Sequence, residues 1–197
     1  MVISNILKTI YNYYPKISES TDEDKTLHRQ KKISNKKGKN NKKLYGLRQI
    51  AEGYEVVDWT DDESCCYEYK ILLHENVSIM DDDKVLIENL DGTRRDLRIF
   101  ISVLEPYYYM FLEKTEYLKA EERWNFSTIT MSRKKDARVI GKIDEYLSKN
   151  KYKKLTSNVV RTLVPDIETQ YKECGEVIVF DCLFTDLVDI ERNEIQC

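Results

Sequence analysis

The chain has 197 residues, of which 41% are hydrophobic and 34% are charged, and its formal net charge at neutral pH is −3. This length is sufficient for one domain with a hydrophobic core, and so small a net charge gives no general attraction to nucleic acid or to a membrane surface. No run of the sequence approaches the roughly 20 apolar residues that a membrane-spanning helix requires, and the N-terminus shows no secretory signal. The five cysteines are an odd number without framework spacing, which predicts free thiols in a reducing cytoplasm.

Apolar and aromatic residues recur at helical spacing near the N-terminus, from Ile3 to Tyr14. This pattern predicts an amphipathic helix over residues 2–14. Pro15 ends the helix, because the residue before a proline is pushed out of the α region. A polar, acidic loop over residues 18–24 follows.

Residues 25–43 have the most unusual composition of the chain and contain the run HRQKKISNKKGKNNKK. One interpretation is an arm that binds the phosphates of nucleic acid through lysines 31–43. The other is a solvated, mobile surface loop or the exposed face of a frayed helix. We favour the second, because stacking aromatic residues are absent until Tyr45 and the remaining chain is acidic enough to outweigh the tract. The prediction is therefore a basic loop or mobile insertion at about 25–43.

The middle of the chain predicts a mainly antiparallel sheet. After a short helix over 44–51 and an approach to the sheet over 54–60, the run YEYKILLH at 67–74 is typical of a strand. Alternating apolar residues then predict three more strands, at 97–104, 107–117 and 124–129. Their connections are Glu105-Pro106 and the polar residues 119–122, and Asp91-Gly92 marks an earlier turn.

The last third of the chain predicts a second clear helix over 137–149, with Asp136 as its N-cap. Thr156 or Ser157 caps a short helix that ends before Pro165. The final apolar run, at 177–184, is typical of a buried strand. Together these patterns predict a single α+β domain covering residues 1–197, in which a sheet of four or five strands packs against helices near 2–14 and 137–149.

Residue patterns for catalysis are weak. Neither His28 nor His74 stands at metal-ligand spacing from a cysteine or another histidine. Cys65-Cys66 with His74 could form a thiol–imidazole pair, but buried or incidental cysteines are the preferred interpretation. The sequence contains no phosphate-binding loop, dinucleotide-binding glycine motif or nucleophile elbow. We therefore predict no catalytic, cofactor-binding or metal-binding residue, and expect a protein that is not an enzyme.

Carboxylates form two clusters, which are the candidate partner-binding residues: Asp58, Asp61, Asp62 and Glu63, then Asp81, Asp82 and Asp83. Grouped carboxylates also occur in metal-dependent nucleases, but there they sit on rigid elements beside a lysine or histidine. Here they fall in predicted loops, so a solvated acidic edge is preferred over a metal site. A third interpretation is an acidic docking surface that steers a cationic partner.

Three segments resemble a known group of proteins: LKTIYNYYPKI near the start, CYEYKILLH through RIFISVLEPYYYMFLEKTEY in the middle, and TLVPDIETQYKECGEVIVFDCLFTD near the end. They resemble the small cytoplasmic immunity proteins that are encoded beside bacterial polymorphic toxins, of the contact-dependent or secreted-toxin type. The resemblance covers most of the chain apart from the lysine tract.

The resemblance implies a protein without an active site that neutralises a cognate toxin by stoichiometric occlusion. It also implies a toxin domain, such as a nuclease, as partner. We expect no cofactor and no membrane partner, and nucleic acid is the less favoured partner. Many such toxins are cationic nucleases, for which an acidic edge is a suitable counterpart. The basic tract departs from this pattern, since it would repel a cationic toxin on the same face. Either the basic tract lies on another face, or the toxin surface opposite the tract is acidic. A nucleic-acid-binding accessory protein using lysines 31–43 is the alternative function.

Overall fold

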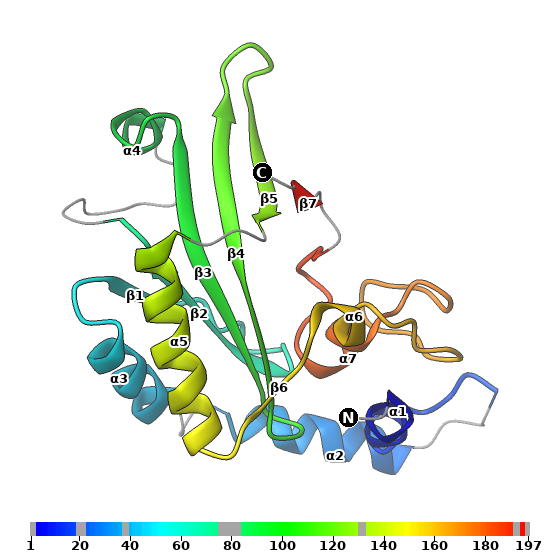
Figure 1. Ribbon diagram of the computed structural model, residues 1–197. Coiled ribbons are helices and arrows are strands. Elements are labelled where there is room, and N and C mark those ends of the chain that lie inside the picture. The colour runs from blue at the N-terminus through cyan, green and yellow to red at the C-terminus, as the bar shows by residue number, and fades with distance from the viewer. Residues whose placement is uncertain are drawn as a thin grey trace.

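The structure is a computed structural model that describes residues 3–18, 23–36, 40–74, 84–129, 133–190 and 194–195. A long twisted sheet runs through the molecule, with helices on both sides of its lower part (Figure 1). This architecture confirms the predicted α+β class and the mainly antiparallel sheet.

The sheet has the strand order β1-β2-β3-β4-β5-β7, with β6 beside β4. Neighbouring strands from β1 to β5 are antiparallel, whereas β6 and β7 pair in parallel with β4 and β5. The strands are β1 (Glu55–Asp58), β2 (Cys66–Leu72), β3 (Thr93–Ser102), β4 (Tyr107–Leu118), β5 (Arg123–Ile129), β6 (Lys153–Lys154) and β7 (Glu194–Ile195). The four strands predicted from the sequence are β2 to β5, and the predicted approach to the sheet contains β1.

The described helices are α1 (Ile3–Ile10), α2 (Glu23–Ser34), α3 (Asn40–Ile50), α4 (Lys84–Asn89), α5 (Lys134–Lys149), α6 (Ser157–Val160) and α7 (Val179–Leu183). The predicted helices near 2–14 and 137–149 correspond to α1 and α5. Asp136 does not occupy the N-cap position but lies inside the first turn of α5, where its carboxylate accepts the backbone N–H of Arg133 at 3.2 Å. It still satisfies a helix-end donor, in the way that an acidic residue at the third position does.

Strand alternation divides the core between the two faces of the sheet. On β3, Leu97, Ile99 and Ile101 point to the face that α3 and α5 cover, in one hydrophobic cluster. Phe100 points to the other face and packs with α1 and α7 in a second cluster. Further along that second face the alternate positions carry charged residues, and these form the candidate site.

The prediction of a loop at about 25–43 is wrong for most of the described part of this segment, which is helical in α2 and α3. The other form of the favoured interpretation, an exposed helix, fits α2, none of whose residues is buried. Lysine, arginine and glutamine are good helix formers, and Glu23 and Asp24 lie in the first turn, where negative charge favours the helix. The guanidinium of Arg29 lies 4.3 Å from the ring centroid of Tyr14, so α2 is held against the α1 region.

The prediction of a strand at 177–184 is also wrong, because the segment forms α7. A short, continuous apolar run does not distinguish a buried strand from a buried helix. Here the carboxylate of Asp181 accepts the backbone N–H of Ile178 at 2.8 Å, which satisfies a donor at the start of the helix. All residues of α7 are buried, so no polar face revealed its period.

Candidate protein-binding cleft

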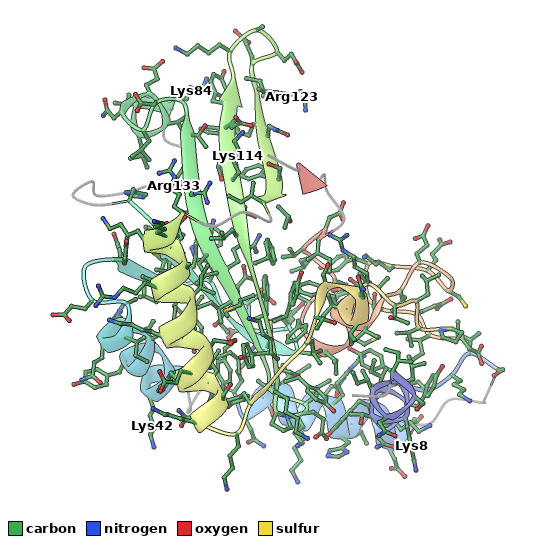
Figure 2. The ribbon with its side chains drawn as sticks, in the orientation of Figure 1. Lys8, Lys42, Lys84, Lys114, Arg123 and Arg133 are labelled. Carbon is green, nitrogen blue, oxygen red and sulfur yellow. The ribbon has the colours of Figure 1, made fainter. Side chains whose placement is uncertain are left out.

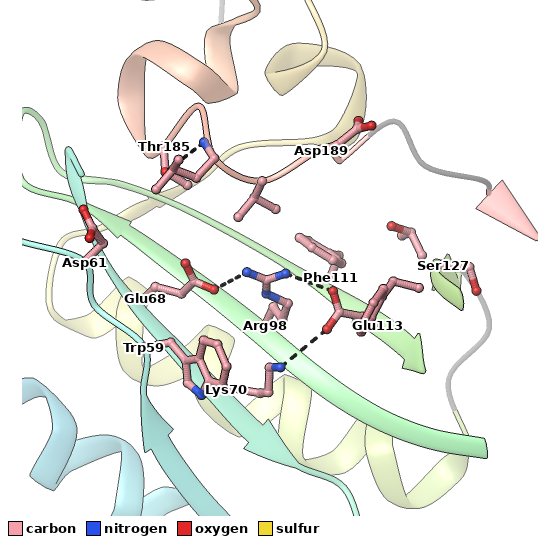
Figure 3. Close-up of a pocket in the computed structure, with 14 residues that line it drawn as sticks. Trp59, Asp61, Glu68, Lys70, Arg98, Phe111, Glu113, Ser127, Thr185 and Asp189 are labelled. Atoms are coloured by element: carbon pink, nitrogen blue, oxygen red, sulfur yellow. Dashed lines mark hydrogen bonds and ion pairs between the residues drawn. The ribbon is translucent and has the colours of Figure 1, made fainter. Parts of the chain in front are cut away.

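An open cleft of about 500 Å³ lies on the face of the sheet that α3 and α5 do not cover (Figure 3). Its floor is formed by β2, β3 and β4, one wall by Trp59 and Asp61 after β1, and the opposite wall by residues 185–189 after α7. Six charged side chains line it, and we call it the acidic cleft.

Four charged residues from three strands meet on the floor of the acidic cleft. Lys70 on β2 is the cross-strand partner of Arg98 on β3, and the antiparallel register places Glu68 and Glu113 diagonally beside Arg98. Because side chains alternate between faces, all four point to the same side of the sheet.

These four residues form a connected set of ion pairs, drawn as dashed lines in Figure 3. Arg98 donates to Glu113 at 2.9 Å and to Glu68, while the Lys70 ammonium lies 3.7 Å from the second oxygen of Glu113. Each carboxylate is therefore held in place by a cation. Removing charge from water is costly, and a geometry with several mutual contacts offsets that cost.

Burial and pairing act in opposite directions on this set. Burial raises the pKa of Glu68, although Arg98 and Lys70 counteract it. Burial by itself would lower the pKa of Arg98, but the neighbouring Glu113 and Glu68 outweigh it and raise the pKa. The guanidinium therefore stays charged and anchors both carboxylates.

The cleft combines excess negative charge with exposed apolar surface. Its lining contains the carboxylates of Asp61, Glu68, Glu113 and Asp189 against the cations of Lys70 and Arg98, an excess of two negative charges. Trp59 is 43% exposed at one wall, where the Lys70 ammonium lies 4.4 Å from its ring centroid, and Leu187 is 56% exposed at the other. Such a surface is complementary to a protein segment with a basic and an apolar side chain.

Of the first predicted carboxylate cluster, the structure places Asp61 in the lining of the acidic cleft, while Asp58, Asp62 and Glu63 lie nearby in sequence but do not line it. The Asp61 carboxylate also accepts the backbone N–H groups of Glu63 at 2.8 Å and Ser64 at 3.0 Å, so it shapes the loop. Asp58 similarly accepts the N–H of Thr60 at 3.0 Å. Asp62 and Glu63 are exposed. The second cluster, Asp81, Asp82 and Asp83, lies outside the described residues.

Sequence reasoning missed Glu68, Lys70, Arg98 and Glu113 as site residues. One signal was present: charged residues occupy alternate positions of strands whose other positions are apolar, which is the pattern of a sheet with one polar face. The sequence could not show that three strands bring these charges together beneath a cleft.

The cysteines and His74 do not form the thiol–imidazole pair that the sequence left open. Cys65 and Cys66 stand at the start of β2 and His74 follows its end, and a strand of this length spans roughly 20 Å. The thiols contact hydroxyl groups instead, with Cys65 Sγ 3.5 Å from that of Tyr14 and Cys66 Sγ 3.9 Å from that of Ser64. Burial raises the pKa of both thiols, which opposes thiolate formation.

Over the described ranges, no group of three or more histidine, cysteine, aspartate or glutamate side chains is arranged to hold a metal ion. In the same part of the chain, no helix combines the length and the apolar character needed to cross a membrane.

No protein-family model, curated protein or solved structure matches this chain. The resemblance to immunity proteins consequently rests on the three sequence segments alone. What the structure adds is the acidic cleft as a candidate binding surface.

Proposed function

We propose that this chain is a non-catalytic immunity protein that binds a cognate bacterial toxin and neutralises it by stoichiometric occlusion. The observation that carries the proposal is the acidic cleft, which combines two excess carboxylates with exposed apolar walls. Inhibition by occlusion requires a preformed surface that matches the partner, and it requires no reacting group.

The ion pairs under the cleft support a binding role because they fix the carboxylates before a partner arrives. Glu68 and Glu113 are held by Arg98, so little side-chain freedom is lost when a complex forms. An excess of negative charge in a concave site also concentrates field lines and accelerates association with a cationic protein. A nuclease toxin, whose own substrate is a polyanion, would carry such a cationic surface.

The proposed site of action is the cytoplasm, where a newly made toxin would meet its inhibitor. Buried free thiols are compatible with that compartment: Cys65, Cys66 and Cys182 are unpaired and buried.

The test uses the gene next to the one that encodes this chain. The open reading frame immediately upstream is co-expressed, as its C-terminal domain, with this chain in a host that the domain alone kills. We expect growth to be rescued and a complex of fixed stoichiometry to co-purify. If the domain is toxic and the chain neither rescues growth nor co-purifies with it, the proposal is wrong.

A further inference from the structure

A groove lies on the face of the sheet opposite the acidic cleft, and no described residue lines both. It consists of two adjoining cavities of about 410 and 390 Å³ that share Lys43, Asn150 and Tyr152 in their linings. Each has the size of a pocket for a small ligand. We call the pair the basic groove.

Two lysine-rich segments that are far apart in the sequence meet at the basic groove. The first is the described part of the basic tract at the end of α2 and the start of α3, which contributes Lys32, Lys36, Lys42 and Lys43 to the lining. The second is the connection 149–154 from α5 to β6, which reads KNKYKK and supplies Asn150 and Tyr152.

Specific contacts bring the two segments together. α3 approaches α5 closely because Gly46 has no side chain, and a Cβ atom at this position would lie 2.2 Å from the hydroxyl oxygen of Tyr146. The second segment is held beside the β3–β4 turn because Lys153 donates its backbone N–H to the carbonyl of Pro106 at 2.8 Å. The groove is thus part of the packed structure.

Tyrosines supply the aromatic surface that the basic tract lacks in sequence. Tyr67 from β2, Tyr146 from α5 and Tyr152 line the basic groove. The Lys43 ammonium lies 4.4 Å from the ring centroid of Tyr67. Lysines interleaved with aromatic rings are the arrangement by which proteins hold single-stranded nucleic acid, with cations on phosphates and rings on bases.

The charge of the lining is predominantly positive. Four lysines and one carboxylate belong to the lining, and that carboxylate, of Glu105, already accepts the Tyr13 hydroxyl at 2.9 Å. Lys36 turns its ammonium toward Ser64, but Lys42 in the lining and Lys153 beside it are exposed. A local basic surface therefore exists on a chain whose net charge is −3.

The basic groove and the acidic cleft lie on opposite faces of the sheet. Tyr67 and Ile101 line the groove, whereas Glu68 and Arg98 on the same two strands line the cleft. Side chains alternate along a strand, so the two sets point in opposite directions. A cationic partner in the cleft would face away from the lysines.

We propose that the basic groove binds single-stranded nucleic acid without sequence preference, with phosphates at Lys42 and Lys43 and bases against Tyr146 and Tyr152. This inference rests on the groove alone and is independent of toxin binding. It gives the basic tract a role that the acidic cleft does not explain.

The test measures the fluorescence anisotropy of labelled oligothymidylate and oligouridylate of about 12 nucleotides, a length in the usual range for one binding site. We expect the full chain to bind both, with an affinity that falls as salt rises because counterions are released from the phosphates. Unlabelled thymidine or uridine monophosphate should compete poorly. Competition by the monophosphate as strong as by the oligonucleotide, or no binding of the oligonucleotides at low salt, would overturn the proposal.

Two triple variants separate a specific groove from general positive charge. Lys42→Ser/Lys43→Ser/Lys153→Ser should weaken oligonucleotide binding by about tenfold or more, since each lost phosphate contact reduces the affinity. Lys84→Ser/Lys119→Ser/Arg123→Ser removes the same charge from the other end of the molecule, where Figure 2 shows Lys84 and Arg123 far from Lys42, and should leave binding close to that of the original chain.

Equal weakening by the two triple variants would show that only net charge matters and would refute the proposal that the basic groove is the binding site. Because Lys43 packs on Tyr67, the double variant Lys42→Glu/Lys153→Glu, which alters exposed side chains only, is measured as well. It should also lose binding while its circular dichroism and thermal unfolding match those of the original chain. Oligonucleotide binding retained by this folded double variant would also refute the proposal.

Discussion

The ammonium group of Lys36 donates hydrogen bonds to Ser64, at 2.9 Å to the carbonyl oxygen and 3.3 Å to the hydroxyl. It also donates to the carbonyl of Asp61. A buried lysine of the basic tract thereby closes the loop that carries the acidic residues, and its own burial lowers its pKa. The two segments of opposite charge are therefore one structural unit.

Replacement of this lysine should destabilise the protein. Lys36→Met keeps the apolar volume but removes the ammonium donor, so the Ser64 carbonyl loses this hydrogen bond and the Asp61 carbonyl keeps the one from the Ser64 hydroxyl. We expect a loss of about 1–3 kcal/mol in the free energy of unfolding. Urea denaturation measures it. The control is Lys31→Met in the exposed part of α2, which should change stability by no more than about 0.5 kcal/mol. Equal stability of the two variants would show that the buried contacts contribute nothing.

Arg98 should stabilise the protein by neutralising the two buried carboxylates that it holds. Arg98→Met leaves Glu68 and Glu113 buried with only Lys70 nearby, and breaking a buried ion pair in this way costs about 3–5 kcal/mol. The triple variant Glu68→Gln/Arg98→Met/Glu113→Gln removes the charges together and should be more stable than Arg98→Met alone. Chemical denaturation measures the free energy of unfolding of both proteins, and the prediction is wrong if the triple variant is the less stable.

Asp96 should make stability depend on pH. It is fully buried beside Arg94, and burial raises its pKa from the ordinary 3.8 to about 6, although Arg94 and Lys70 oppose the shift. Between these values the folded protein binds the proton more tightly than the unfolded chain, so its contribution to stability falls as pH rises from about 4 to about 6. The full difference corresponds to roughly 3 kcal/mol.

The measurement compares unfolding free energies of the original chain and Asp96→Asn across this pH range. Glu68 and Asp181 also have pKa values raised by burial, and they remain in the variant, so the difference between the two curves isolates Asp96. We expect the original chain to lose stability relative to the variant as pH rises. Parallel curves would show that Asp96 does not titrate in this range.

Charge reversal next to Asp61, beside the wall of the acidic cleft, should slow toxin association. The variant is Asp62→Lys/Glu63→Lys, because Asp61 also holds two backbone N–H groups and its replacement would disturb the loop. We expect an association rate lower by roughly tenfold at low salt, a smaller effect at high salt, and a nearly constant dissociation rate.

Surface plasmon resonance with the purified toxin domain measures both rates. The matched control, Glu52→Lys/Glu145→Lys, makes the same charge change beside α3 and on α5, which cover the other face, and should associate much as the original chain does. If the two variants associate at the same rate, the acidic cleft is not where the toxin binds.

The buried thiols should be chemically inert in the folded protein. Cys65, Cys66 and Cys182 are buried and burial raises the pKa of each, whereas Cys174 is exposed. In Cys174→Ser/Cys197→Ser protein, we expect a thiol reagent such as Ellman's reagent to react only as fast as the chain unfolds. A rapidly reacting thiol in the native variant would instead favour thiol chemistry.

Local patterns in the sequence were sufficient for the antiparallel strands at the centre of the fold. Alternation from Leu97 onward and the break at Glu105-Pro106 predict β3 and β4 because both are properties of neighbouring residues. The apolar stripe that predicts α5 is likewise a property of residues close together in the sequence. Where polarity did not vary with position, in the apolar run at 177–184 and in the basic tract, no period could be read and the predicted elements were wrong.

By itself, the sequence determined which side chains of each strand share a face, and it identified the two segments of opposite charge. Only the tertiary structure decided which charges meet: the register of β2, β3 and β4 joins Glu68 and Glu113 to Arg98, and the packing of α3 on α5 places the basic tract beside residues 149–154. The reason is that strand register and helix packing are set by apolar surface buried over the whole sheet. The buried apolar surface depends on contacts between residues that are distant in the sequence, so no single segment reveals it.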